Sequence, residues 1–142
     1  MTNELKNPPC FASRLNSMGE RLDLWSGDNN VLGWIARQGT IKGLKLVDFN
    51  SPQHLEGLTV KELTSALENV SLRTGAVCTR FPAEFEGGAF SNPEPSKRRA
   101  AINLVLNAGE WAMDLGAKEL VVWSAFDGYD YSLQADYEVM WT

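Results

Sequence analysis

Four short apolar runs, separated by longer segments with helical periodicity, constrain the fold of this chain more than any other feature. The runs cover residues 10–15, 44–49, 76–81 and 120–123, and the strand ends, near Asn16, Asn50, Phe81 and Trp123, lie 31 to 42 residues apart. Continuously apolar strands that alternate with helices are typical of a parallel sheet with right-handed crossovers. The pattern predicts a single α/β domain with the order βαβαβαβ, followed by the first turns of a fourth helix at 136–142.

The predicted helices have recognisable ends. Asn30 is a plausible N-cap for a helix over 31–38, and Thr59 with Glu62 forms the pattern of a capping box that opens a second helix. A third helix follows Pro95 and ends before Gly116. The side chains expected to face the core are Val31, Leu32, Ile35 and Ala36 in the first helix, Leu63, Ala66, Leu67 and Val70 in the second, and Ala101, Leu104, Val105, Ala108, Trp111, Ala112 and Leu115 in the third.

The spacing of the units fits two architectures. An eight-unit barrel of about 250 residues uses roughly 31 residues per unit, so four units would make half a barrel. An open, flavodoxin-like sheet has units of similar length and would place the fourth strand between two others. The spacing alone therefore leaves both architectures open.

Composition excludes several functional classes. The 142 residues carry a formal net charge of −5 without a basic block, which disfavours nucleic acid and anionic membranes as partners. No apolar run reaches the length of a membrane span and no secretion signal is visible, so we expect a cytoplasmic protein.

Cys10 and Cys78 are expected to be buried free thiols about 10 Å apart, beyond disulfide reach. His54 is the only histidine, which argues against a zinc site built from histidines.

A series of motifs between residues 79 and 131 resembles one known family. The segment contains Thr79-Arg80-Phe81, the loop Phe85-Glu86-Gly87-Gly88-Ala89-Phe90, the helix-opening pair Arg98-Arg99, the helix-to-strand turn Gly116-Ala117-Lys118, Trp123 at a strand end, and Asp127-Gly128-Tyr129. In this order, the motifs are similar to the third and fourth βα units of the xylose isomerase family. Asn50-Ser51-Pro52-Gln53-His54 looks more like the family's uncharacterised sugar isomerase and epimerase relatives.

The resemblance implies a (β/α)8 barrel that interconverts aldose and ketose sugars. In that family two divalent metals, usually Mg, Mn or Co, polarise the sugar oxygens and promote a hydride shift. The ligands of those metals lie on the fifth to eighth strands, so we expect residues 1–142 to be the N-terminal half of the barrel, truncated at the start of the fourth helix. On this interpretation the chain itself provides no metal ligand and, alone, turns over no sugar.

Four residues are the main candidates for binding the sugar, and a fifth, Asp130, is a weaker one. Trp123 and Phe81 lie at the ends of predicted strands, where an aromatic ring can stack on the apolar face of a sugar. Asn50 follows the second predicted strand, where polar side chains point into the mouth of a barrel. Asp127, and with less weight Asp130, could accept hydrogen bonds from sugar hydroxyls, although Asp-Gly is also an ordinary turn signal.

His54 and Asp48 are the candidates for acid–base chemistry. The family places a histidine and a nearby aspartate at the end of the second strand for ring opening, and the corresponding segment here carries Asp48 with His54 six residues later. A histidine has an intrinsic pKa suited to proton transfer near neutral pH.

Two other functional classes remain open from the sequence. Half a barrel exposes its first and last strands, so the chain could be a non-catalytic or split subunit that completes a barrel with a second copy or with a complementary chain. The other possibility is an open-sheet domain that binds a small molecule and has no relationship to a barrel. The barrel fold also hosts endonucleases that act on abasic sites in DNA, but the single histidine and acidic charge disfavour that activity.

Overall fold

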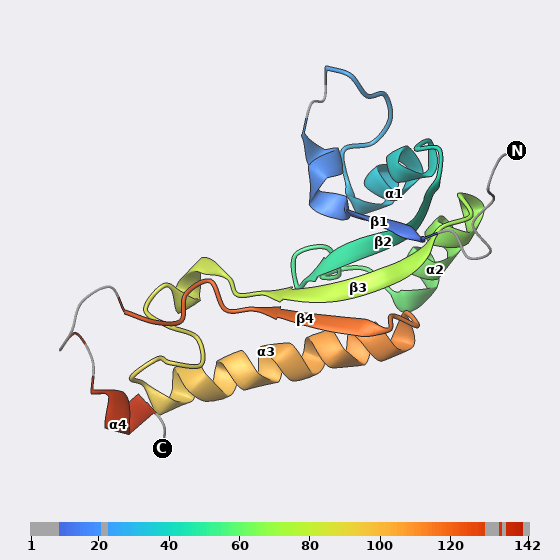
Figure 1. The fold of residues 1–142 in the computed structure, drawn as a ribbon. Helices are drawn as coiled ribbons and strands as arrows, with labels where there is room; N and C mark the ends of the chain where they lie inside the picture. The colour runs from blue at the N-terminus through green and yellow to red at the C-terminus, as the bar shows by residue number, and fades with distance from the viewer. Residues whose placement is uncertain (1–8, 21–22, 130–133, 135, 141–142) are drawn as a thin grey trace, which may run out of the picture.

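A four-stranded, all-parallel sheet forms the centre of the computed structural model, which describes residues 9–20, 23–129, 134 and 136–140 (Figure 1). The strands are β1 (Phe11–Arg14), β2 (Leu44–Ser51), β3 (Arg73–Arg80) and β4 (Glu119–Trp123). They lie side by side in the order β1-β2-β3-β4, and every neighbouring pair is parallel. The predicted α/β class and all four predicted strands are confirmed.

The connecting helices begin where the sequence predicts. The helix α1 (Val31–Gly39) has Asn30 as its N-cap, and α2 (Val60–Asn69) opens with a complete capping box between Thr59 and Glu62. The long helix α3 (Pro95–Asp114) starts with its proline, and α4 (Tyr137–Met140) is a single described turn. Short 3-10 turns, η1 (Leu15–Gly19) and η2 (Ala83–Phe85), follow β1 and β3.

The three long helices pack against the same face of the sheet. Val47 and Phe49 of β2 and Val77 of β3 are fully buried in one core with Ile35 of α1. The helices α2 and α3 supply Leu63, Leu67, Ala108 and Ala112 to that core. The opposite face of the sheet carries the alternate side chains of the strands, and among the described residues no helix shares a core with it.

Sequential strand order explains this one-sided arrangement. Each right-handed crossover moves the chain by one strand in the same direction, so each helix is laid on the same face. In an open doubly wound sheet the direction reverses and helices cover both faces. The alternative of an open sheet, in which β4 would be paired on both sides, does not hold, because β4 pairs only with β3 in the described chain.

The sheet curls toward its helix-free face, which we call the concave face. Alternate strands of a flat sheet lie roughly 10 Å apart. A Cβ atom placed on Gly75 of β3 would nevertheless lie only 3.6 Å from the Cβ of Ala12 on β1. The same Cβ would overlap the Asp48 carboxylate, so the close approach of three strands depends on a glycine at this position.

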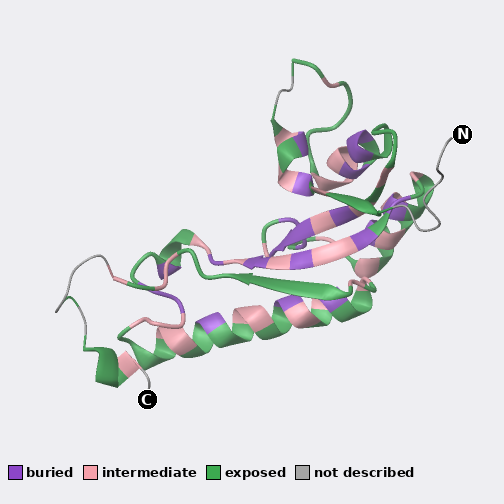
Figure 2. Cartoon of the chain, in the orientation of Figure 1, coloured by how far each residue is buried: buried purple, intermediate pink, exposed green. Residues whose placement is uncertain are grey.

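Burial corrects several expectations. Cys10 is exposed rather than buried, because it precedes the edge strand β1, and Cys78 is half-buried; both are free thiols. Ala36 of α1 is exposed, whereas Arg37 and Gln38 are buried and donate hydrogen bonds to the backbone oxygens of Met18 (2.8 Å) and Ser13 (3.2 Å). Figure 2 shows that β4 is exposed along its whole length, unlike β2 and β3. No helix in the described ranges has both the length and the apolar character needed to cross a bilayer.

Candidate functional site

The carboxyl ends of the four strands bring a small set of side chains together on the concave face. Arg14 is the last residue of β1, Arg80 of β3 and Trp123 of β4, and Asn50 is the penultimate residue of β2. Leu15, Phe49 and Thr79, the neighbours of Arg14, Asn50 and Arg80, are buried, so alternation along each strand directs these three side chains to the other face, where Asn50 is nevertheless only 3% exposed. Trp123 joins them as the partner of Arg80 in the β3–β4 register. The predicted substrate residues Trp123 and Asn50 therefore share one face and one edge of the sheet.

Trp123 and Arg80 form the best-defined contact of the site. They are direct partners in the β3–β4 register, and the guanidinium carbon of Arg80 lies 4.3 Å from the centre of the Trp123 ring. This cation–π contact holds the indole at the edge of the sheet while leaving it 47% exposed. One face of the ring is thus covered by a cation, and the side chain still offers apolar surface to a ligand.

Asp48 supports the strands from the middle of the concave face. Its Oδ1 atom accepts a hydrogen bond from the backbone nitrogen of Ala76 at 2.9 Å, where the β2–β3 register is irregular. Gly75 leaves room for the carboxylate. Asp48 therefore replaces a missing hydrogen bond of the β2–β3 ladder. This contact is structural and gives no indication of proton transfer.

His54 lies behind the end of β2 and is only 2% exposed. Its Nδ1 atom accepts a hydrogen bond from the backbone nitrogen of Asn50 at 2.9 Å, so the ring proton of the neutral form is on Nε2. The ring packs edge-on against Trp34 at 6.0 Å between centroids. Burial, followed by the positive charges of Arg80 and Arg14, lowers the pKa of His54 to about 4. At neutral pH this histidine is an uncharged acceptor for the backbone.

Cys78 faces the concave side, because it alternates along β3 with the buried Val77 and Thr79. It pairs with Asn50 in the β2–β3 register, and its side chain is half-buried. Burial raises the pKa of the thiol, an effect that Arg14 and Arg80 partly oppose and Asp48 reinforces. The thiol is therefore protonated at neutral pH and is a poor nucleophile.

The structure places Phe81 apart from this set. Phe81 is 7% exposed and lies in an aromatic cluster with Phe85, Phe90 and Phe126, next to Ala101 of α3. Its ring centre lies 5.4 Å from that of Phe85 and 5.3 Å from that of Phe90. The cluster supports the loops beyond β3 and β4 from the helix side of the sheet.

Asp127 joins the two loops at the carboxyl edge. Its Oδ1 atom accepts hydrogen bonds from the backbone nitrogens of Ala89 (3.0 Å) and Ser91 (2.8 Å) and from the Ser91 hydroxyl (2.7 Å). The Tyr129 hydroxyl donates to the backbone oxygen of Ser91 at 2.9 Å. The oxygen that could accept from a sugar is thus saturated by the chain itself, and Oδ2 is buried without a partner. Asp130 lies outside the described residues.

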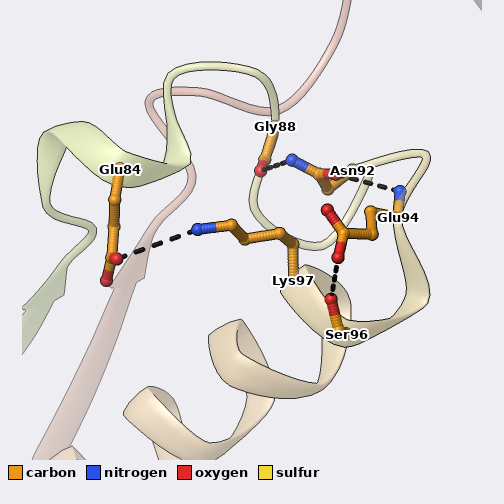
Figure 3. A network of polar contacts seen from close by, with 6 residues as sticks. All are labelled: Glu84, Gly88, Asn92, Glu94, Ser96 and Lys97. Carbon is orange, nitrogen blue, oxygen red and sulfur yellow. Dashed lines mark hydrogen bonds and ion pairs between the residues drawn. The ribbon is translucent and has the colours of Figure 1, made fainter.

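The loop between β3 and α3 is also braced internally (Figure 3). Asn92 donates to the backbone oxygen of Gly88 at 2.8 Å and accepts from the backbone nitrogen of Glu94 at 3.0 Å. Glu94 also accepts from the Ser96 hydroxyl, and Lys97 pairs with Glu84 at 3.8 Å. Arg98, the first residue of the double arginine, donates to the backbone oxygens of Asn92 and Pro93, so it fixes this loop.

The described residues offer no metal centre. Nowhere in them do three or more histidine, cysteine, aspartate or glutamate side chains group so that they could hold an ion. A hollow of about 690 Å³ lies at the amino half of the sheet and is lined by Leu46, Arg73, Val121 and their neighbours. It is separate from the strand-end side chains.

No protein-family model matches the chain. The sequence identified Trp123, Asn50 and Asp48 as candidates but gave no role to Arg14 and Arg80. Both arginines lie one residue before the end of a predicted apolar run, and the structure makes each the last residue of its strand.

Proposed function

We propose that this chain supplies the first four units of a xylose isomerase-like barrel that acts on a sugar by aldose–ketose isomerisation or epimerisation. The observation that carries the proposal is the position of Trp123 on the concave face, at the carboxyl end of β4, with its indole half exposed. Ligands of parallel barrels bind at that end of the strands. The one-sided helix layer and the curl of the sheet at Gly75 also support a barrel.

In this proposal the described residues bind and orient the sugar. The free face of the Trp123 ring stacks on the apolar face of the sugar, and Arg80 holds the indole in place. Asp48 and His54 maintain the strand ends through backbone hydrogen bonds. Because no metal site is present among the described residues, we expect sugar binding without turnover from this part of the chain.

Substitution of Trp123 tests the proposal. Covering about 50 Å² of indole contributes about 1 kcal/mol, or roughly a fivefold change in affinity. We therefore expect Trp123→Ala to weaken the binding of D-xylose or D-fructose about fivefold in NMR titrations, and Trp123→Phe to weaken it less. Trp25→Ala, in the loop before α1, is the matched control. The proposal fails if the wild-type chain binds no sugar, or if both tryptophan-to-alanine variants behave alike.

The β4 edge favours a second candidate function. In this function the chain is a non-catalytic subunit that completes a barrel with another copy of itself. Leu120, Val121 and Val122 are 40–43% exposed although they belong to an apolar strand. A groove of about 560 Å³ runs between β4 and α3, lined by Leu106 and Met113 among others. Unpaired backbone groups beside exposed apolar side chains form a template for another strand.

Light scattering coupled to size exclusion distinguishes this candidate. Self-completion predicts a particle of twice the 15.7 kDa chain mass. Val122→Lys should convert it to a monomer, because an inward or edge lysine blocks strand pairing. Leu24→Lys, at a loop position that is 63% exposed, should leave the dimer intact. A wild-type monomer at micromolar concentrations would exclude self-completion.

A further inference from the structure

We propose that the outer side of α3 is an interface with a second copy of this chain, in which the two α3 helices pack antiparallel across a two-fold axis. The inference goes beyond the proposed function, because it concerns the side of the helix layer that faces away from the sheet. It rests on an exposed apolar stripe along α3, a glycine within that stripe, and charges of opposite sign at the two ends of the helix.

The stripe consists of Ile102, Leu106, Gly109 and Met113, which follow one another at steps of four, three and four residues, the spacing of a seam between helices. The three apolar side chains are 48%, 62% and 74% exposed, in chain order. Leu106 lies roughly 200° around the helix from the fully buried Ala108, so the stripe points away from the core. Figure 1 shows α3 along one margin of the molecule, and Figure 2 shows exposed residues along its whole length. A surface helix normally has one apolar side, whereas α3 has two.

Gly109 leaves space in the middle of the stripe. Glycine inside a helix is less favourable than alanine, and the fold gives no reason for it here, because an added Cβ would meet only the Leu120 side chain, at an ordinary 3.8 Å. An antiparallel partner gives a reason. With the two-fold axis between Leu106 and Gly109, Leu106 of each copy fits over Gly109 of the other, and Ile102 lies opposite Met113. The groove of about 560 Å³ beside Gly109 offers room for the entering side chain.

The charges of α3 suit an antiparallel partner. Lys97, Arg98 and Arg99 lie in its first turns, and Glu110 and Asp114 lie in its last, the reverse of what the helix dipole favours. The loop before α3 engages Lys97 and Arg98. Within the described ranges, the side chains of the other three form no ion pair or hydrogen bond.

An antiparallel copy places the basic start of one helix beside the acidic end of the other. On the two-fold axis between Leu106 and Gly109, Arg99 and Asp114 of the two copies are offset by roughly 3 Å along the helix. The same helix therefore supplies both halves of each contact, apolar and charged. Such self-complementarity is what a two-fold interface requires, and it selects a second copy as the partner.

Light scattering coupled to size exclusion of the full 142-residue chain tests the interface. We expect the wild type to form a particle of twice the 15.7 kDa chain mass. Ile102→Lys should raise the dissociation constant of the dimer about hundredfold, because two apolar contacts with Met113 are lost across the axis. Leu24→Lys is the matched control and should leave the dimer intact, since Leu24 is 63% exposed against 62% for Leu106 and lies in the loop before α1.

Reversing the charges gives a second readout. Arg99→Glu and Asp114→Arg should each weaken the dimer about tenfold, because like charges then face each other twice across the axis. The double variant restores opposite charges and should recover most of the affinity. Within one chain the two residues lie roughly 22 Å apart along the helix, so only contact between copies produces the recovery. Circular dichroism verifies that every variant is folded.

The outcomes separate this interface from barrel completion through the β4 edge. A dimer that Ile102→Lys dissociates and Val122→Lys does not supports the α3 interface. A particle of four copies that either variant halves supports both interfaces. A dimer that only Val122→Lys dissociates supports self-completion and overturns the inference. A wild-type monomer at micromolar concentrations, or a double charge variant that dimerises no more tightly than the single variants, also overturns it.

Discussion

Replacing Asp127 by alanine is expected to lower the free energy of unfolding by about 3 kcal/mol, because several donors lose their only acceptor at once. The Oδ1 atom of Asp127 accepts from two backbone nitrogens and one hydroxyl of the loop after β3. Ala89, one of the donors, has no exposed surface, so water cannot readily replace the carboxylate. Urea denaturation monitored by circular dichroism measures the loss.

Two comparisons identify the cause of that loss. Asp127→Asn keeps an oxygen at the same position and should lose about half as much stability. Asp114→Ala, at an exposed position near the end of α3, should change stability by about 0.5 kcal/mol or less. Hydrogen exchange should become fast specifically at the amides of Ala89 and Ser91 in Asp127→Ala. Unchanged protection of these two amides would show that Asp127 does not hold the loop.

Acidification from pH 7 to pH 4.5 is expected to remove about 2.5 kcal/mol of stability through His54 alone. Burial, then Arg80 and Arg14, lowers the pKa of His54 from its ordinary value of 6.5 to about 4 in the folded chain. Above pH 6.5 the residue is neutral in both states and stability is insensitive to it. As the pH falls from 6.5 toward 4, only the unfolded chain takes up the proton, and the folded state loses stability progressively.

His54→Asn isolates this contribution from that of the carboxylates. The asparagine oxygen can accept from the Asn50 nitrogen as Nδ1 does, but the side chain does not titrate. Urea midpoints measured at pH 7, 5.5 and 4.5 should therefore fall less steeply in the variant than in the wild type. Parallel pH profiles for the two proteins would contradict a lowered His54 pKa.

The elements of this fold could be predicted well because their signals are local. Thr59 and Glu62 form a capping box within one turn, and Pro95 opens α3 by its fixed backbone angle. Burial was predicted less well. Ala36 is exposed although it fits the apolar pattern of α1, whereas Arg37 and Gln38 are buried because η1 and β1 offer them backbone acceptors. Such acceptors come from segments distant in sequence, which periodicity cannot reveal.

Only part of the candidate site could be predicted for the same reason. Trp123 and Asn50 were identified because they lie at the ends of apolar runs, but the contact of Arg80 with the Trp123 ring appears only once β3 and β4 are paired. Asp127 was expected to face a ligand, and instead the folded chain uses its Oδ1 atom to join two loops.

The sequence by itself determined the alternation of strands and helices, because apolar periodicity and capping act within a few residues. It left the direction of winding open, since barrel-like and open sheets share the same unit length. The tertiary structure shows the strand order β1-β2-β3-β4 and a single helix layer. It also brought β1, β2 and β3 close together on one face, because Gly75 leaves room for the Asp48 carboxylate and for Ala12.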